Sequence, residues 1–394
     1  MFNLEKIQQA LSAAGMDGWL FYQFHDLDPM ADRILHLPAG RMSSRRWFYW
    51  VPTAGEPVRL VHAIEAAALD EVPGSKRLYV GWRQMEEILR EILAGQGKVA
   101  MQYSPGNAIP YISRVDAGTV ELVRSCGPDV VSSADLVQIF EAVMDDAQEE
   151  SHMEASRILP EIVMEAYREV ARAVSAGKPR SEYDIQQFIM ERFAAHDMET
   201  HHPPIVAVDA HAGDPHFEVP ASGSALITEG SFLLTDIWAK FSKPRSIYAD
   251  ITWTGFVGKE VPAEHAKIFD IVRRARVAAQ DHVIDACAAG RDVRGWEADD
   301  ACRAVVIEAG YQDRFLHRTG HSIGEEVHGN GANVDNLETR DERLLLPRTC
   351  FSVEPGIYLE DFGVRSEVNM IIHADGRAEV SGRQQDEVVP ILVL

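Results

Sequence analysis

The sequence predicts an α/β domain followed by a larger α+β domain. In the first third, short apolar or aromatic runs alternate with helical patterns, which is typical of layered α/β structure. In the second half, long helical patterns flank clusters of short strands and turns, which indicates an α+β arrangement. The chain has 394 residues, enough for two domains of ordinary size.

The first domain is predicted to span residues 1–145. It opens with a helix, because Leu4, Ile7 and Leu11 share one helical face, and Gly15 and Gly18 end that pattern. The remaining expected elements are strands at 19–22, 46–51, 58–61 and 98–101 and a helix at 84–93. The turn at 54–57 indicates a hairpin between the second and third strands. No clustered catalytic signature occurs in this domain.

A polar, acidic segment at 144–150 marks the expected boundary, and the second domain is predicted to span 146–394. Its first helix is expected over 163–174, and Gly177 stops the helical pattern. Ser181 and Asp184 form a capping box that starts the next helix. The remaining expected elements are strands at 204–208, 231–239, 247–256, 350–353 and 367–372 and helices at 263–289 and 297–309.

The charge and the cysteines narrow the range of partners. Net charge is −23, which argues against nucleic acid and anionic membrane, because both reward basic patches. No stretch approaches the roughly 18 apolar residues of a membrane span. The N-terminal segment has an acid and a base early, at Glu5 and Lys6, unlike a signal peptide. The four cysteines lie far apart, which favours reduced thiols in a cytoplasmic protein.

Four carboxylates and one imidazole carry the chemistry of the second domain. They are Asp236, Asp250, His321, Glu354 and Glu367, each in a strand-like or turn-like setting. Hard divalent cations prefer carboxylate oxygen, and an imidazole extends the choice to Mn, Co, Fe or Zn. For either aspartate alone a turn or cap role is more common, and for the histidine alone a hydrogen-bonded core position is more common. If the five residues converge, they form a two-metal hydrolase site.

Three motifs, taken together in this order, are specific. They are Gly-His-x-Ile-Gly-x-x-Val-His from Gly320 to His328, Val-Glu-Pro-Gly-Ile-Tyr from Val353, and Gly-Val-Arg-x-Glu ending at Glu367. With the two upstream aspartates, the sequence resembles the M24 metallopeptidases, the pita-bread family of Xaa-Pro aminopeptidases, prolidases and methionine aminopeptidases. The first third is similar to the creatinase/prolidase-type N-terminal domain, which favours the proline-directed branch.

The resemblance implies a pita-bread catalytic domain with Asp236, Asp250, His321, Glu354 and Glu367 as ligands of two divalent metals. Manganese is the first choice, with Co, Fe or Zn as alternatives. The resemblance further implies a homodimer and a peptide or dipeptide substrate with proline at the second position. It also implies roles for three more residues: His328 contacts substrate, His216 lies on the leaving-group side, and Arg365 supports the site.

The expected reaction is hydrolysis of the Xaa-Pro bond by a hydroxide held between the metals. Glu354 relays the proton, His328 stabilises the oxyanion, and His216 lies near the proline. Whether the chain is a dipeptidase or an aminopeptidase stays open.

Departures from the family pattern leave the substrate preference open. The two aspartates are 14 residues apart instead of 11, and extra residues in the turn at 240–245 can absorb the difference. Trp253, Ser322, Gly329 and Val368 replace the more usual Arg, Gly, Glu and Asp. One alternative is therefore a same-fold enzyme acting on a small molecule, similar to ectoine hydrolase or a dimethylsulfoniopropionate lyase. The other is a non-catalytic pita-bread binding module, against which the complete ligand set argues.

Overall fold

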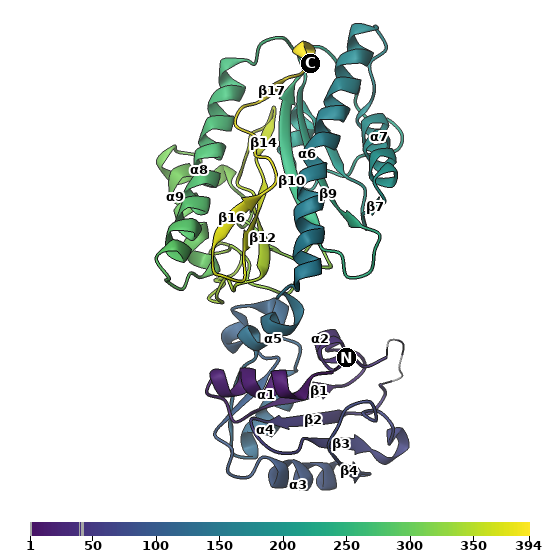
Figure 1. The fold of residues 1–394 in the computed structure, drawn as a ribbon, viewed down its shortest axis with the longest axis vertical. Coiled ribbons are helices and arrows are strands. Elements are labelled where there is room, and N and C mark those ends of the chain that lie inside the picture. The colour runs from purple at the N-terminus through teal and green to yellow at the C-terminus, as the bar shows by residue number, and fades with distance from the viewer. Residues whose placement is uncertain (1, 39, 41–42) are drawn as a thin grey trace. The chain divides into compact units, whose positions relative to one another are not determined.

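The protein divides into two compact units, Met1–Glu141 and Ala142–Leu394. The structure, a computed structural model, describes residues 2–38, 40 and 43–394 (Figure 1). The division falls four residues before the boundary expected from the sequence.

The N-terminal unit is built on one mixed sheet of six strands in the order β4-β3-β2-β1-β5-β6. Its strands are β1 (Gly18–Gln23), β2 (Trp47–Pro52), β3 (Val58–His62), β4 (Ser75–Tyr79), β5 (Lys98–Met101) and β6 (Asp129–Ser132). Its helices are α1 (Leu4–Ala13), α2 (Pro29–Ile34), α3 (Trp82–Ile92), α4 (Ala117–Ser125) and α5 (Ala134–Glu141). Strand β2 is antiparallel to β1 and β3, and the other neighbouring strands run parallel.

Alternating side chains of the central strands pack into two separate apolar cores, one on each face of the sheet. On β1, Trp19 and Phe21 pack with α1, α2 and α5, while Leu20 and Tyr22 pack with α3 and α4. Because successive strand residues point to opposite faces, a strand that is apolar at every position is buried on both sides. The unit is therefore a three-layer α/β structure.

The second unit contains four long helices and eleven strands among its described elements. The helices are α6 (Asp146–Ser175), α7 (Glu182–Ala195), α8 (Ala263–Ala288) and α9 (Gly295–Glu308). The strands are β7 (Met198–Glu199), β8 (Ile205–Val208), β9 (Phe232–Phe241), β10 (Ala249–Phe256), β11 (Ser322–Ile323), β12 (Thr349–Val353), β13 (Gly356–Tyr358), β14 (Gly363–Arg365), β15 (Val368–Ile372), β16 (Ala378–Ser381) and β17 (Val389–Pro390).

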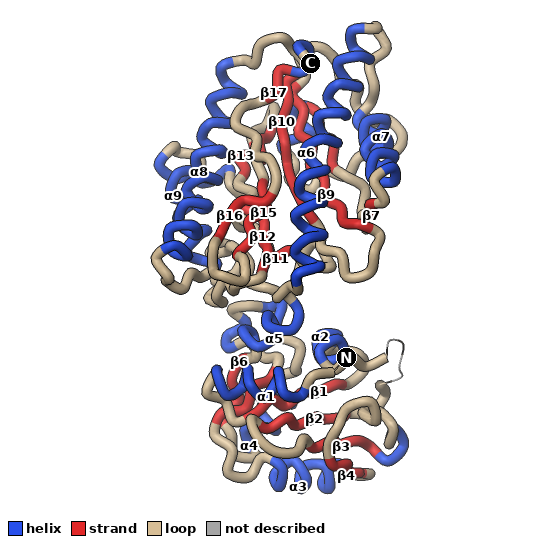
Figure 2. Tube along the Cα trace, in the orientation of Figure 1, coloured by secondary structure: helices blue, strands red, loops and turns tan. Residues whose placement is uncertain are grey.

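These strands form three sheets between two helix layers. Strands β17, β10, β9, β8 and β7 make the first sheet, which α6 and α7 cover. Strands β11, β12, β15 and β16 make the second sheet, and β13 pairs with β14. Helices α8 and α9 lie on the other side of the strands from α6 and α7 (Figures 1 and 2). The polar positions between these layers hold the candidate site.

Helix α6 begins well before the helix expected at 163–174. The Asp145 side chain caps its N-terminus by accepting from the Gln148 backbone N–H, and Gln148 Oε1 accepts from the Asp145 backbone N–H. The acidic segment at the domain boundary is thus the first turn of a 30-residue helix, and its acids lie at the helix N-terminus, where they interact favourably with the helix dipole. The expected capping box at Ser181 is present at the start of α7.

Candidate metal centre

Asp236 and Asp250 lie on one face of the antiparallel pair β9–β10. Asp236 lies opposite Thr252, and Asp250 lies opposite Trp238. Directly opposed residues of an antiparallel pair point to the same side, and so do residues two apart on one strand. These four side chains therefore share a face, while Ile237 and its neighbours on the other face pack against α6 and α7. Both aspartates are buried inside paired strands, where a turn or cap role does not apply.

His321 and the two glutamates come from the second sheet. His321 immediately precedes β11, and its backbone N–H donates to the Ser352 hydroxyl at 2.9 Å. The Ser352 hydroxyl donates to Glu354 Oε1 at 2.9 Å, and Glu354 follows β12. A Cβ at Gly320 would collide with the Ser352 carbonyl, so only glycine permits this close passage. Glu367 lies directly before β15.

The five predicted ligands converge. His321 Nε2 lies 3.6 Å from Asp250 Oδ2 and 3.4 Å from Glu354 Oε1. Possible ligand atoms of Asp250, His321 and Glu367 all lie within 4.8 Å of one another. Asp236 is near enough to Glu354 and Glu367 for its charge to influence both, and all five residues belong to one cluster.

The protonation of this cluster reflects burial of like charges. Burial and the neighbouring carboxylates raise the pKa of Glu367 well above its usual range and that of Asp250 to about 7. Burial also raises the pKa of Asp236, although the guanidinium beside it opposes this effect. Burial acts on Glu354 too, but the surrounding cationic groups, His321 first, outweigh it and lower its pKa. The pKa of His321 is raised, because Asp250 and Glu354 outweigh its burial.

The donor set fits divalent metal ions. One oxygen of each of three carboxylates is buried without a hydrogen-bond partner in the described structure: Asp236 Oδ1, Asp250 Oδ1 and Glu367 Oε1. A buried carboxylate oxygen without a partner is costly, and coordination of a cation removes that cost. Carboxylate oxygens together with one imidazole nitrogen are suitable ligands for Mn, Co, Fe or Zn.

Arg365 braces the cluster from one side. Its Nη2 lies 2.5 Å from Asp236 Oδ2, and its Nε donates to the Thr252 hydroxyl at 3.0 Å. The Thr252 hydroxyl in turn donates to Glu367 Oε2 at 2.8 Å. Arg365 therefore holds one predicted ligand directly and a second through Thr252.

Two site residues had no role assigned from the sequence. The Tyr358 hydroxyl accepts from Arg365 Nη1 at 3.0 Å and lies 2.7 Å from His317 Nε2. Burial lowers the pKa of His317, so its ring is neutral at physiological pH. His317 lies four residues before His321, but its partner Tyr358 is 41 residues away in the chain, so no signal in the sequence indicated the contact.

The two predicted substrate histidines differ in placement. The His328 ring meets the His321 ring edge-on, with centroids 4.4 Å apart. The charge of His321, followed by burial, lowers the pKa of His328 to about 3, which leaves a neutral imidazole. His216 lies exposed on the loop after Gly213, and its backbone N–H donates to Asp214. That loop touches the site through the Pro215 carbonyl, which accepts from Arg365 Nη1 at 3.3 Å.

The departures from the family pattern do not face the carboxylates. Trp253 points to the far side of β10 and packs in the core beneath α6 and α7. The Ser322 hydroxyl accepts from the Gly331 N–H, and the Gly329 N–H donates to the Ser322 carbonyl. The extra residues between the aspartates lie in the hairpin tip at 242–248, and the β9–β10 ladder is continuous on both sides of the ligands.

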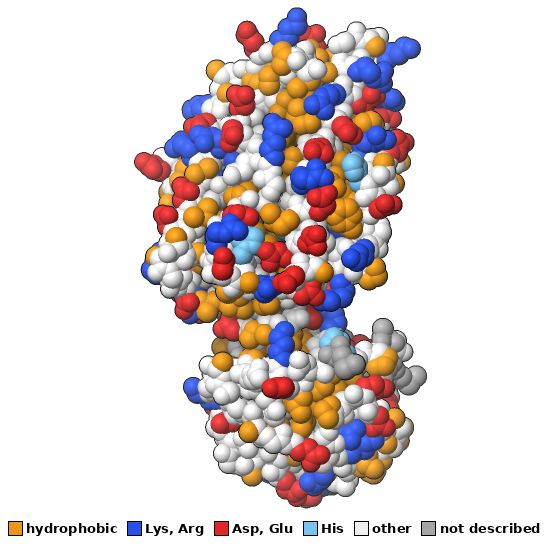
Figure 3. Space-filling view, viewed as in Figure 1, with side chains coloured by type: hydrophobic (Ala, Val, Ile, Leu, Met, Phe, Trp, Pro, Cys, Tyr) orange, Lys and Arg blue, Asp and Glu red, His pale blue; other side chains and the backbone are white. Residues whose placement is uncertain are grey.

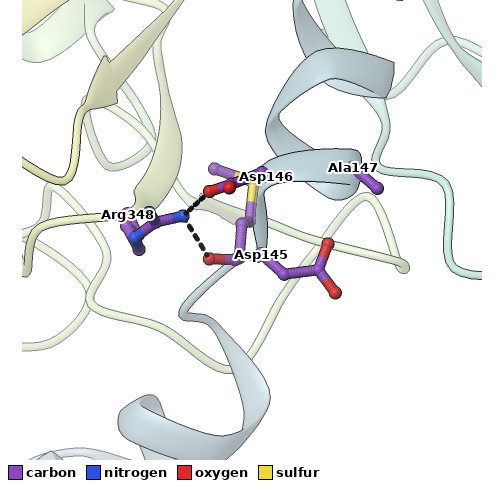
Figure 4. Close-up of a pocket in the computed structure, with 5 residues that line it drawn as sticks. Asp145, Asp146, Ala147 and Arg348 are labelled. Atoms are coloured by element: carbon purple, nitrogen blue, oxygen red, sulfur yellow. Dashed lines mark hydrogen bonds and ion pairs between the residues drawn. The ribbon is translucent and has the colours of Figure 1, made fainter.

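A surface pocket at the start of α6 is separate from this cluster. It is lined by Met144, Asp145, Asp146, Ala147 and Arg348 (Figure 4). Arg348 Nη1 lies 2.7 Å from Asp146 Oδ1 and donates to the Met144 carbonyl, which fastens α6 to the segment before β12. The pocket thus serves the attachment of α6 and contains none of the predicted site residues.

The surface carries charged side chains of both signs. Acidic and basic side chains are interspersed over the face shown in Figure 3. Among the described residues, no helix is both long and apolar enough to cross a membrane.

Comparison with known proteins gives one family and several relatives. The model for metallopeptidase family M24 matches residues 154–374. The probable dipeptidase PepE of Mycobacterium tuberculosis is 26% identical over 340 residues, covering 86% of this chain and 84% of that protein. The Xaa-Pro dipeptidase of Lactobacillus helveticus is 34% identical over 127 residues, 32% of each chain.

The similarity to one solved structure extends over nearly the whole of this chain. The crystal structure of dipeptidase PepE from Mycobacterium ulcerans superposes with a TM-score of 0.66 at 22% identity. The match covers 98% of this chain and 96% of that one. This likeness confirms the predicted fold class.

Proposed function

The chain belongs to metallopeptidase family M24, and on that premise we propose that it is a two-metal exopeptidase that hydrolyses Xaa-Pro bonds. Membership confirms the resemblance expected from the sequence and makes the protein a hydrolase of the metallopeptidase type. The observation that carries the proposal is the convergence of Asp236, Asp250, His321, Glu354 and Glu367, with three carboxylate oxygens lacking partners in the described structure.

These five residues are proposed to hold the two metals. Bound there, divalent ions would lower the pKa of a water molecule and polarise the substrate carbonyl. Arg365 keeps Asp236 in place, and Thr252 orients Glu367 through its hydroxyl. Because both supports are buried hydrogen bonds, the carboxylates are fixed before substrate arrives.

Glu354 is the proposed proton acceptor. Its lowered pKa keeps it ionised, and its Oε1 is already occupied by the Ser352 hydroxyl at 2.9 Å. A carboxylate that stays ionised is able to take the proton of the attacking water. A positioned carboxylate of this kind transfers the proton onward to the leaving amine.

His328 is proposed to stabilise the developing oxyanion. Its imidazole is neutral, and a neutral ring still donates one N–H. His216 is proposed to lie toward the proline side, since its loop rests on Arg365 through Pro215.

We further propose the metal, the location and the oligomeric state. Manganese is the preferred metal, because carboxylate-rich sites with one imidazole suit it. A cytoplasmic location is supported by four free cysteines. A homodimer is supported by the family resemblance.

The decisive measurement is metal content together with activity on Ala-Pro, Ala-Pro-Ala and Ala-Ala. We expect two metals per chain after Mn²⁺ loading and preference for the proline substrates. Cleavage of Ala-Pro alone indicates a dipeptidase, and cleavage of Ala-Pro-Ala indicates an aminopeptidase. Hydrolysis of Ala-Ala at the same rate as the proline substrates would contradict specificity for proline.

A matched pair of variants tests the proton acceptor. Glu354→Ala should lower kcat by a factor of about 100 or more, as expected for loss of a general base. Glu360→Ala, at an exposed glutamate nearby in sequence, should not. Undiminished activity of Glu354→Ala would contradict the assignment of Glu354 as the proton acceptor.

A further inference from the structure

A group of aromatic side chains adjoins the ligand Asp250. We call Trp238, Tyr248 and His201 the aromatic wall. Trp238 lies directly opposite Asp250 in the β9–β10 ladder, and it is two residues beyond Asp236 on the same face. The Cβ atoms of directly opposed residues lie about 5 Å apart, so the indole begins next to the metal ligands.

The members of the wall contact one another. The His201 ring lies 6.4 Å from the Trp238 ring and 5.8 Å from the Tyr248 ring, centroid to centroid. The Tyr248 hydroxyl is 3.5 Å from His201 Nδ1. Trp238 is half-buried and His201 is exposed, so part of the wall faces outward. The indole Nε1–H of Trp238 has no partner among the described residues.

The wall also reaches the predicted oxyanion residue. Trp238 packs with Val327 in one apolar cluster, and Val327 immediately precedes His328. His201 is close enough to affect the pKa of His328. The wall therefore extends along the side of the cluster occupied by Asp250 and His328.

The opposite side of the cluster is already occupied. There Arg365 binds Asp236 and holds the loop of His216 through the Pro215 carbonyl. In the proposed function, that loop lies on the proline side of the scissile bond. The substrate residue that precedes the scissile bond is therefore expected to lie against the aromatic wall.

We propose that Trp238 and His201 line the subsite for the side chain preceding the scissile bond, and that they select a bulky uncharged side chain there. This inference rests on the proposed function. Phenylalanine or leucine at this position covers the indole and gains both apolar burial and ring contact, which alanine does not.

The charges around the wall agree with an uncharged occupant. The charge of Lys240 is engaged at the Tyr248 end of the wall, where its Nζ lies over the Tyr248 ring and donates to the Glu325 carbonyl at 2.7 Å. Burial and the nearby charges of His202 and Lys240 lower the pKa of His201, so its ring is neutral at physiological pH.

The test compares kcat/KM of the Mn²⁺-loaded protein for Phe-Pro, Leu-Pro, Ala-Pro, Lys-Pro and Asp-Pro, with Phe-Ala and Ala-Ala alongside. We expect Phe-Pro to exceed Ala-Pro by about tenfold, the range that added apolar contact in a pocket supplies. In Trp238→Ala the Phe-Pro to Ala-Pro ratio should fall toward one. His201→Ala, which removes an exposed ring and endangers folding less, should lower the same ratio.

The matched control is Trp296→Ala, because Trp296 lies on α9 beneath Arg340 and outside the wall. It should keep the wild-type ratio. The inference is overturned if kcat/KM is higher for Lys-Pro or Asp-Pro than for Phe-Pro. It is also overturned if the Phe-Pro to Ala-Pro ratio is unchanged in both Trp238→Ala and His201→Ala. If only Phe-Ala and Ala-Ala are cleaved, proline specificity fails and their ratio tests the wall instead. If no substrate in the panel is cleaved, both proposals fall.

Discussion

One buried histidine, His152 of α6, is predicted to contribute less to the stability of the metal-free protein as the pH falls. Its Nδ1 lies 2.7 Å from the Tyr248 carbonyl, and its Nε2 lies 2.8 Å from the Ser381 hydroxyl. A carbonyl can only accept, so Nδ1 carries the proton and Nε2 accepts from the hydroxyl. The neutral ring is thus fully satisfied, and it ties α6 to β10 and β16.

Burial lowers the pKa of His152 from 6.5 to about 4. The unfolded chain therefore binds a proton at this residue between these two values, while the native protein does not. Stability contributed by the neutral ring is complete above pH 6.5 and is lost as the pH falls toward 4. The full difference corresponds to about 3 kcal/mol, of which about 2 kcal/mol is lost between about pH 7 and about pH 5.

Urea unfolding of the metal-free protein at about pH 7 and about pH 5 measures this loss. His152→Gln keeps one donor and one acceptor without titrating, so its free energy of unfolding should fall by about 2 kcal/mol less than that of the wild type. His202→Gln, at an exposed histidine of the same unit, should behave as the wild type does. Equal losses in the wild type and His152→Gln would refute the assignment of the acid sensitivity to His152.

Three further predictions concern the site. Mn²⁺ at 100 times its Kd should raise the free energy of unfolding by about 2.7 kcal/mol. In thermal melts, Asp250→Asn should lose most of this gain. An equal gain in the variant would contradict metal binding at Asp250. Trp253→Ala should lower stability by about 3–5 kcal/mol, because a fully buried indole is lost, yet the Phe-Pro to Ala-Pro ratio should not change, since Trp253 faces away from the site. Arg365→Met leaves Asp236 Oδ2 without its partner, so kcat/KM should fall at least about tenfold, as expected when a residue orienting a metal ligand is lost, with Arg365→Lys intermediate; retention of full activity by Arg365→Met would show that the guanidinium does not position Asp236.

The sequence predicted which residues form the cluster, because ligands of this kind occur in short, recognisable strand and turn motifs. Asp236 and Asp250 could each be placed in a strand from the apolar residues beside them. Which residues lie across from them depends on the register of the hairpin, and the register depends on the conformation of the tip at 242–248. For that reason Trp238 was not identified as a neighbour of Asp250.

The same limit explains Trp253. From the sequence it was one of several changes near the ligands, and proximity in the chain suggested a substrate contact. Successive strand residues point to opposite faces, so a position beside a ligand-facing residue points away from the site. Tyr358 and His317 were missed for a different reason, since their roles depend on hydrogen bonds between separate segments.

Function and stability are coupled in the metal cluster. Three buried carboxylates and the partly buried Glu354 lie together, and Arg365 forms an ion pair with one of them, Asp236. The raised pKa values of Glu367, Asp250 and Asp236 mean that the metal-free protein retains protons where the loaded protein holds cations. In the proposed site, metal binding would displace these protons, so metal affinity is predicted to rise with pH over the range in which the carboxyl groups lose them. The two apolar cores pack on either side of this charged layer, so their close packing is expected to hold the proposed ligands in place in the metal-free protein.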